Sequence, residues 1–148
     1  MGLDCRIRYY NGNEYSFELP EEIANKLKLI NSYGIVGYSV HEYNNNNHYF
    51  VSFRGRPYYN VIENLTEYSL YHDLQPNELN SMYVKLKNKL KEFDFIKEVQ
   101  KAYNDTLNLT DWTTILTDMY IPSPDEIIGL MELFRICYEN NLMLYACY

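Results

Sequence analysis

The chain has 148 residues, a formal net charge of -7 at pH 7, and 47% hydrophobic and 16% aromatic residues. This length suits one domain, and the apolar content is too high for a chain kept disordered by low hydrophobicity. The acidic excess argues against direct nucleic-acid binding, because it repels a phosphate backbone unless basic residues gather on one face. We therefore expect a single folded domain covering residues 1–148.

The tyrosine and cysteine content indicates the kind of surface and the cellular compartment to expect. The 17 tyrosines are typical of binding surfaces, although a genome biased towards A and T also raises the tyrosine content. The cysteines, Cys5, Cys137 and Cys147, are odd in number and form no CxxC pair, which indicates reduced thiols rather than disulfides or a zinc cluster. With no apolar run of membrane-spanning length and no signal-peptide pattern, we expect a cytoplasmic protein without a membrane partner or a cofactor.

A β-hairpin is predicted at the start of the chain. Segments of alternating apolar and polar residues lie on either side of Asn11-Gly12-Asn13, a strong turn signal. A two-residue loop would set Ile7 opposite Ser16 and mix the core and solvent faces. A three-residue loop sets Ile7 opposite Phe17, so we predict this register, with Asn13 in the left-handed conformation.

A helix and a second hairpin are predicted next. Pro20 opens a helix over residues 21–30, whose first turn carries two glutamates that suit the positive end of the helix dipole. Residues 35–42 and 48–53 are rich in β-branched and aromatic side chains and flank a run of four asparagines. This arrangement predicts two paired strands with a polar turn.

Two further helices are predicted to begin at prolines. Pro57 and Pro76 each suit the first turn of a helix, because proline lacks the N–H that would be unpaired there. After Pro76, apolar residues recur every three or four positions from Leu79 to Phe93. Residues 95–103 are predicted to continue as helix, and residues 104–121 to be mostly irregular.

The last quarter of the chain predicts a buried helix followed by a buried strand. Ser123-Pro124-Asp125-Glu126 matches a helix start, in which Ser123 caps the amides and Glu126 completes a capping box. The helix should extend to about Glu139 and pack on two sides, because its apolar residues cover more than one face. Residues 142–148 are almost entirely apolar, which favours a strand inside a sheet.

These elements predict an α+β fold. We expect a mainly antiparallel sheet of about five strands, formed by the two hairpins and the C-terminal strand and packed against four to five helices. Both ends of the chain then contribute to one shared core.

A predicted ligand site lies where the second hairpin meets the Pro57 helix. Arg54-Gly55-Arg56 combines helix N-terminal amides, a glycine that lets a ligand approach the backbone, and two forked guanidiniums, which together favour carboxylate or phosphate. Tyr58 and Tyr59 can add stacking or hydroxyl contacts, as for a nucleotide. The alternative is that both arginines pair with acidic side chains and that Gly55 only turns the chain.

Catalytic and metal sites have no comparable support. His41, His48 and His72 can act as bases or metal ligands, but their spacing indicates no metal site, and surface or structural roles explain them as well. The cysteines lie in apolar or core-facing segments without an adjacent base. A Walker loop, a dinucleotide fingerprint and a nucleophile elbow are all missing, so no catalytic residue is predicted.

Short stretches of the sequence resemble small proteins of phages and mobile elements. They are Met1-Gly2-Leu3-Asp4, the Phe53-Arg54-Gly55 step, and the closing apolar helix and strand. That group has no agreed activity or catalytic residues. The resemblance implies a viral accessory protein that binds a component of the host, including an inhibitor of bacterial defence, and it would place the protein in the host cytoplasm.

Three functions follow from these observations. The first is a non-enzymatic binding protein with a host protein as its partner. The second is a binder of a small anion or nucleotide at Arg54-Gly55-Arg56, and the third is an enzyme with a cleft where a histidine and a carboxylate meet. A homodimer is compatible with the first, because tyrosines suit interfaces and edge strands need cover.

Overall fold

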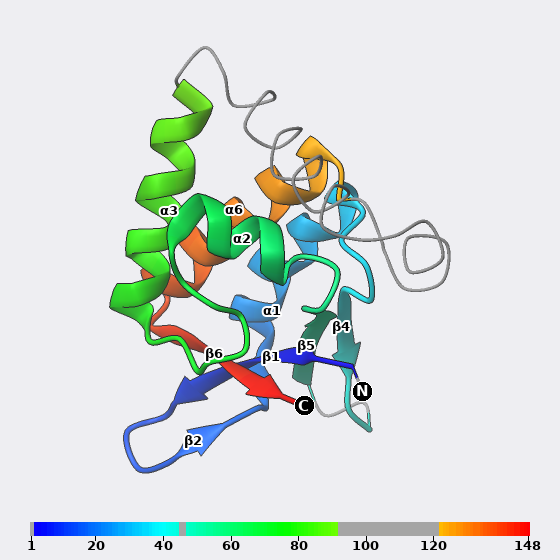
Figure 1. Cartoon of the computed structure of the whole chain (residues 1–148). Coiled ribbons are helices and arrows are strands. Elements are labelled where there is room, and N and C mark those ends of the chain that lie inside the picture. The colour runs from blue at the N-terminus through cyan, green and yellow to red at the C-terminus, as the bar shows by residue number, and fades with distance from the viewer. Residues whose placement is uncertain (1, 45–46, 92–121) are drawn as a thin grey trace.

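A computed structural model of the chain describes residues 2–44, 47–91 and 122–148 (Figure 1). In these ranges an antiparallel sheet packs against α-helices on one face. The six strands are β1 (Asp4–Tyr10), β2 (Tyr15–Ser16), β3 (Leu19–Pro20), β4 (Ser39–Glu42), β5 (His48–Arg54) and β6 (Leu142–Cys147). The helices are α1 (Glu21–Lys28), α2 (Tyr59–Thr66), α3 (Pro76–Lys91) and α6 (Pro124–Glu139), with a 3₁₀ helix at Leu29–Tyr33. The predicted α+β class and antiparallel sheet are confirmed.

Strand β1 lies in the middle of the sheet. Its residues from Asp4 to Tyr9 pair with β6 along one edge, and Asp4 to Arg6 pair with β5 along the other. After Arg6, β1 no longer pairs with β5, and the chain from Tyr15 to Pro20 lies between the two strands. In this segment β2 pairs with β1, and β3 pairs with β5. Strand β4 pairs with the remaining edge of β5.

The predicted register of the first hairpin is wrong. Tyr10 pairs with Tyr15, so the loop has four residues, and the left-handed residue is Gly12 (φ 102°) rather than Asn13. The Asn11 side chain sets this turn, because its Oδ1 accepts hydrogen bonds from the N–H groups of Asn13 (3.0 Å) and Glu14 (3.1 Å). The chain then leaves β1 to join β5, so the predicted pairing of Ile7 with Phe17 does not form.

Most other predicted elements are present. Strands β4 and β5 pair as a hairpin, and Ser123 and Glu126 form the predicted capping box at the start of α6. Strand β4 begins at Ser39 rather than at residue 35, and α2 begins two residues after Pro57. The predictions for residues 95–103 and 104–121 lie outside the described residues.

One hydrophobic core joins the two ends of the chain. Leu3, Ile7 and Leu144 belong to the same buried cluster as the inward faces of α3 and α6. The outer edge of β6 is covered by the chain itself, since Leu144 exchanges two backbone hydrogen bonds with Leu74 (2.9 and 3.0 Å) and the Ala146 N–H donates to Asp73 Oδ1 (3.0 Å). These contacts remove part of this edge as a site for pairing with another strand.

Candidate functional site

The residues predicted to bind an anion lie where β5 ends and α2 begins: Arg54, Gly55, Arg56, Tyr58 and Tyr59. Gly55 is buried, and its N–H donates to the Leu3 carbonyl (2.8 Å). Tyr58 is fully buried, and its hydroxyl accepts a hydrogen bond from the Val36 N–H (2.7 Å). The Gly55 N–H and the Tyr58 hydroxyl, which the sequence suggested as ligand contacts, therefore form hydrogen bonds within the protein.

The other side chains of this turn lie nearer the surface. Arg54 is half-exposed, with its Nε 3.4 Å from Asp4 Oδ1, as the ion-pairing alternative expects. Arg56 is exposed. The Tyr59 ring packs edge-on against Tyr71, with centroids 5.0 Å apart. The anion site at this turn stays a prediction, and the geometry gives its tyrosines packing roles.

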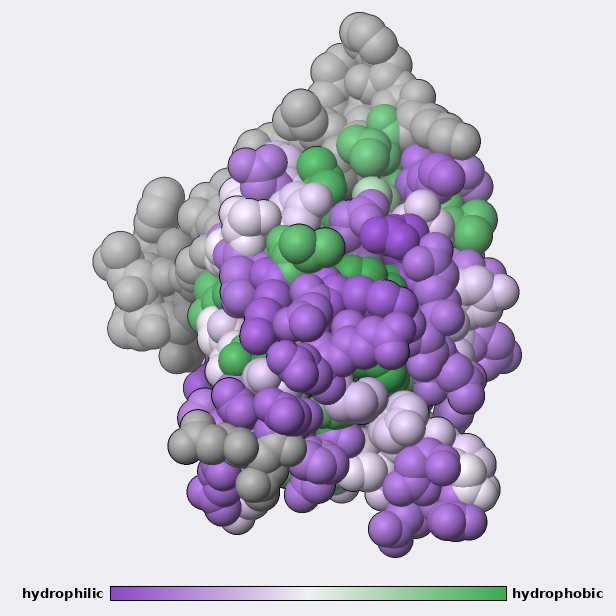
Figure 2. Space-filling view, turned by 180° about the vertical axis from the view of Figure 1, so that it is seen from behind, coloured by the Kyte–Doolittle hydropathy of each residue, from purple (hydrophilic) through white to green (hydrophobic). Residues whose placement is uncertain are grey.

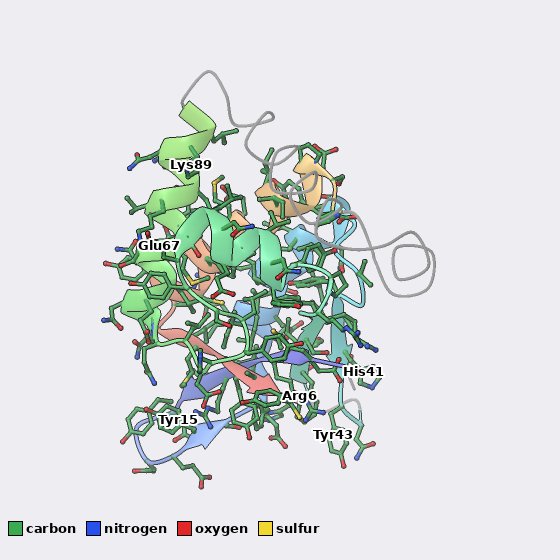
Figure 3. All side chains as sticks on the ribbon, in the orientation of Figure 1. Arg6, Tyr15, His41, Tyr43, Glu67 and Lys89 are labelled. Atoms are coloured by element: carbon green, nitrogen blue, oxygen red, sulfur yellow. The ribbon has the colours of Figure 1, made fainter. Side chains whose placement is uncertain are left out.

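The sheet face opposite the helices carries residues that sequence reasoning did not assign to a site. Alternation along β1 points Cys5 and Ile7 into the core and Arg6 to the other side. Figure 3 shows Arg6, Tyr15, His41 and Tyr43 on the side of the sheet away from the helices. We call this surface the open face, defined by Asp4, Arg6, Arg8, Tyr10, Tyr15, Phe17, Ser39, His41, Tyr43, Phe50, Ser52, Arg54 and Tyr145.

The open face contains a hollow of about 360 Å³. Strand register explains its composition, because Arg6 lies opposite Ser52 and Ser52 lies opposite Ser39, giving a polar row across three strands. The next row along the strands places Phe50 opposite His41. The residues that line the hollow are Arg6, Phe17, Ser39, His41, Phe50, Val51 and Ser52, and none of them is acidic.

The two arginines of β1 on this face have different environments. Arg8 has its guanidinium 4.6 Å from the Tyr15 ring centroid and 4.9 Å from that of Tyr145, and 4.0 Å from Asp73 Oδ2. The Arg6 side chain is exposed and makes no hydrogen bond or ion pair within the described part of the chain, and the same holds for the His41 side chain. The hollow thus presents a cationic group without an internal counter-ion, next to aromatic rings.

Buried thiols on the core side have little nucleophilic character. Burial, followed by the charge of Asp4, raises the pKa of the Cys5 thiol to about 12. Burial also raises the pKa of Cys137. Cys147 at the end of β6 is only partly buried. Because the thiolate is the reactive form, the geometry gives no support to a cysteine nucleophile at Cys5 or Cys137.

Alkylation of the native protein should therefore be selective. At pH 8, we expect iodoacetamide to modify Cys147 and to reach Cys5 and Cys137 only after denaturation, as followed by peptide mass spectrometry. The raised pKa of Cys5 also makes stability depend on pH. Below the ordinary thiol pKa of 9.0, the contribution of Cys5 to the free energy of unfolding is complete, and this contribution is lost as the pH rises above 9.0. Equal labelling rates for Cys5 and Cys147 in the native protein would contradict this assignment.

A histidine and a carboxylate lie together at a second hollow of about 380 Å³, whose lining includes His72 and Asp73, but among the described residues no ion pair joins these two side chains. His48 and Glu18 approach to 3.5 Å, but both are half-exposed and neither lines the hollow of the open face. Residues 2–44, 47–91 and 122–148 hold no group of three or more His, Cys, Asp or Glu that could bind a metal. Of the described helices, none combines the length and the apolar character needed to cross a membrane. Comparisons with protein-family models, curated proteins and solved structures gave no significant match.

Proposed function

We propose that this chain is a non-enzymatic binding protein of viral or mobile-element type, and that it contacts a host protein through the open face. The observation that carries the proposal is the composition of that face, where tyrosine, phenylalanine and arginine side chains lie together on one side of the sheet. Tyrosine and arginine are among the residues that dominate the binding energy of protein interfaces. Inhibition of a bacterial defence protein is the form of this activity that the resemblance to phage proteins suggests.

Charge indicates what the partner surface should carry. Arg6 and His41 lack an internal counter-ion in the described part of the chain, and the lining of the hollow contains no carboxylate. The chain as a whole has a net charge of -7. An acidic patch on the partner would therefore be attracted to the hollow more strongly than to the acidic remainder of the molecule, which favours one orientation.

The rear of the molecule has a different character. Figure 2 shows a mainly hydrophilic surface there, in which hydrophobic residues form only small separate areas. Such scattered apolar residues are usual on a protein surface and indicate no contact site. Among the described residues seen from this side, no large hydrophobic area competes with the open face as a contact surface.

Charge reversal at two positions tests the proposal. We expect the natural chain to retain a bacterial protein from a host lysate, and we expect Arg6→Glu to reduce that retention at least tenfold because it puts a carboxylate opposite an acidic patch. Lys89→Glu is the matched control, since it makes the same charge change on α3, on the helical side of the molecule (Figure 3). Retention that is insensitive to Arg6→Glu, or no retained protein at all, would refute the proposal.

A further inference from the structure

The polar row of the hollow has more hydrogen-bond donors than a carboxylate can use. Arg6, Ser52 and Ser39 lie directly opposite one another on β1, β5 and β4, so neighbouring Cβ atoms are about 5 Å apart. A guanidinium offers five N–H groups and each serine one hydroxyl. Phosphate, with its three terminal oxygens, matches this set better than the two oxygens of a carboxylate.

The second row of the hollow supplies aromatic rings two residues along β5 from the polar row. Phe50 lies two residues from Ser52 along β5, which places it about 7 Å from the polar row. Phe17 completes this side of the hollow. Both rings are held by edge-on contacts outside the hollow, Phe17 by Tyr145 (centroids 5.4 Å apart) and Phe50 by Tyr43 (5.5 Å). Aromatic rings held in this way can stack with a planar group of a ligand.

The size and charge of the hollow suit a small anion with a planar part. Its volume of about 360 Å³ is within the range of small-molecule sites. Arg8, the neighbouring arginine of β1, already lies against Tyr15 and Tyr145, whereas Arg6 makes no ion pair within the described residues. Arg6 is thus the guanidinium available to an anion in the hollow.

We infer that the hollow binds a nucleoside monophosphate, with the phosphate on the row of Arg6, Ser52 and Ser39 and the base against Phe17 and Phe50. The sugar of a nucleotide separates its phosphate from its base, which suits the spacing between the two rows. This small-ligand site goes beyond the proposed protein contact, and a bound nucleotide would occupy part of the open face.

Titration of the full ¹⁵N-labelled chain with AMP and UMP, followed by amide NMR, tests the inference. We expect saturable shifts at Arg6, Ser39 and Ser52. Adenosine, which lacks the phosphate, and inorganic phosphate, which lacks the ring, should each bind at least tenfold more weakly than AMP. These comparisons separate a nucleotide site from an apolar patch and from a bare anion site.

Two arginine variants locate the site. We expect Arg6→Ala to weaken AMP binding at least tenfold, because the charged donor at the hollow is lost. Arg54→Ala makes the same chemical change at the turn predicted from sequence, at an arginine of the same face that lies beside Asp4 and does not line the hollow, and it should leave the affinity within twofold. Both side chains are exposed, so both variants should fold, which thermal unfolding checks.

Several results would overturn the inference. They are the absence of saturable shifts with both nucleotides, binding of inorganic phosphate as tight as that of AMP, and a loss of affinity with Arg54→Ala but not with Arg6→Ala. Tighter binding of a single-stranded oligonucleotide than of its mononucleotide would also overturn it, since the face would then be a nucleic-acid surface. None of these results depends on the lysate experiment, so the proposed protein contact can fail or succeed separately.

Discussion

Leu144→Ala is expected to lower the free energy of unfolding by about 2–5 kcal/mol, as is usual for a large-to-small change in a core. Leu144 is 1% exposed, lies opposite Ile7 in the β1–β6 ladder, and pairs with Leu74 on the other side. The substitution removes apolar contacts in the region where the two ends of the chain meet. Chemical denaturation followed by circular dichroism would measure the loss.

Leu29→Ala is the matched control for this experiment. It makes the same chemical change at a leucine that is 71% exposed, so we expect a loss within about 0.5 kcal/mol. Similar losses for the two variants would mean that β6 is not part of the core. The shared core of both chain ends, on which the position of the open face depends, would then be wrong.

Local signals in the sequence were sufficient for several elements. The capping box of Ser123 and Glu126 needs only neighbouring residues. The apolar run from Leu142 indicates a strand, because a strand inside a sheet buries apolar side chains on both faces. The first hairpin was harder, because its register depends on the Asn11 side chain and on the pairing of Leu19 with Tyr49 in a distant strand. Residues far apart in the sequence thus decide where this strand goes.

The candidate site was less accessible to sequence reasoning for the same reason. Arg6, Ser52 and Ser39 come from three strands, and nothing near any of them in the sequence indicates the row that they form. The alternation of β1 does show that Arg6 lies on the face opposite Cys5, which was the available signal. The Arg54-Gly55-Arg56 motif was visible because its residues are adjacent, although Gly55 is in fact packed against the core.

Gly55→Ala should lower the free energy of unfolding by about 1–3 kcal/mol, the usual cost of overpacking a core. A Cβ at this position would lie 2.6 Å from Cys5 Sγ and 2.7 Å from Leu3 Cδ2, and both of those residues are buried. Structure around the new methyl group must therefore shift. If the glycine served only to let a ligand approach the backbone, the same substitution would leave stability unchanged and weaken ligand binding.

A double-mutant cycle identifies the cause of that loss. Cys5→Ala removes the sulfur nearest to the new methyl group, so the losses from Gly55→Ala and Cys5→Ala should not add, with a coupling of about 0.5–3 kcal/mol in favour of the double variant. Cys137→Ala, at a buried cysteine of α6 that is not among the atoms nearest to position 55, should be additive with Gly55→Ala. Additivity in both cycles would exclude the clash with Cys5 as the cause, and a ligand-binding role for Gly55 would regain support.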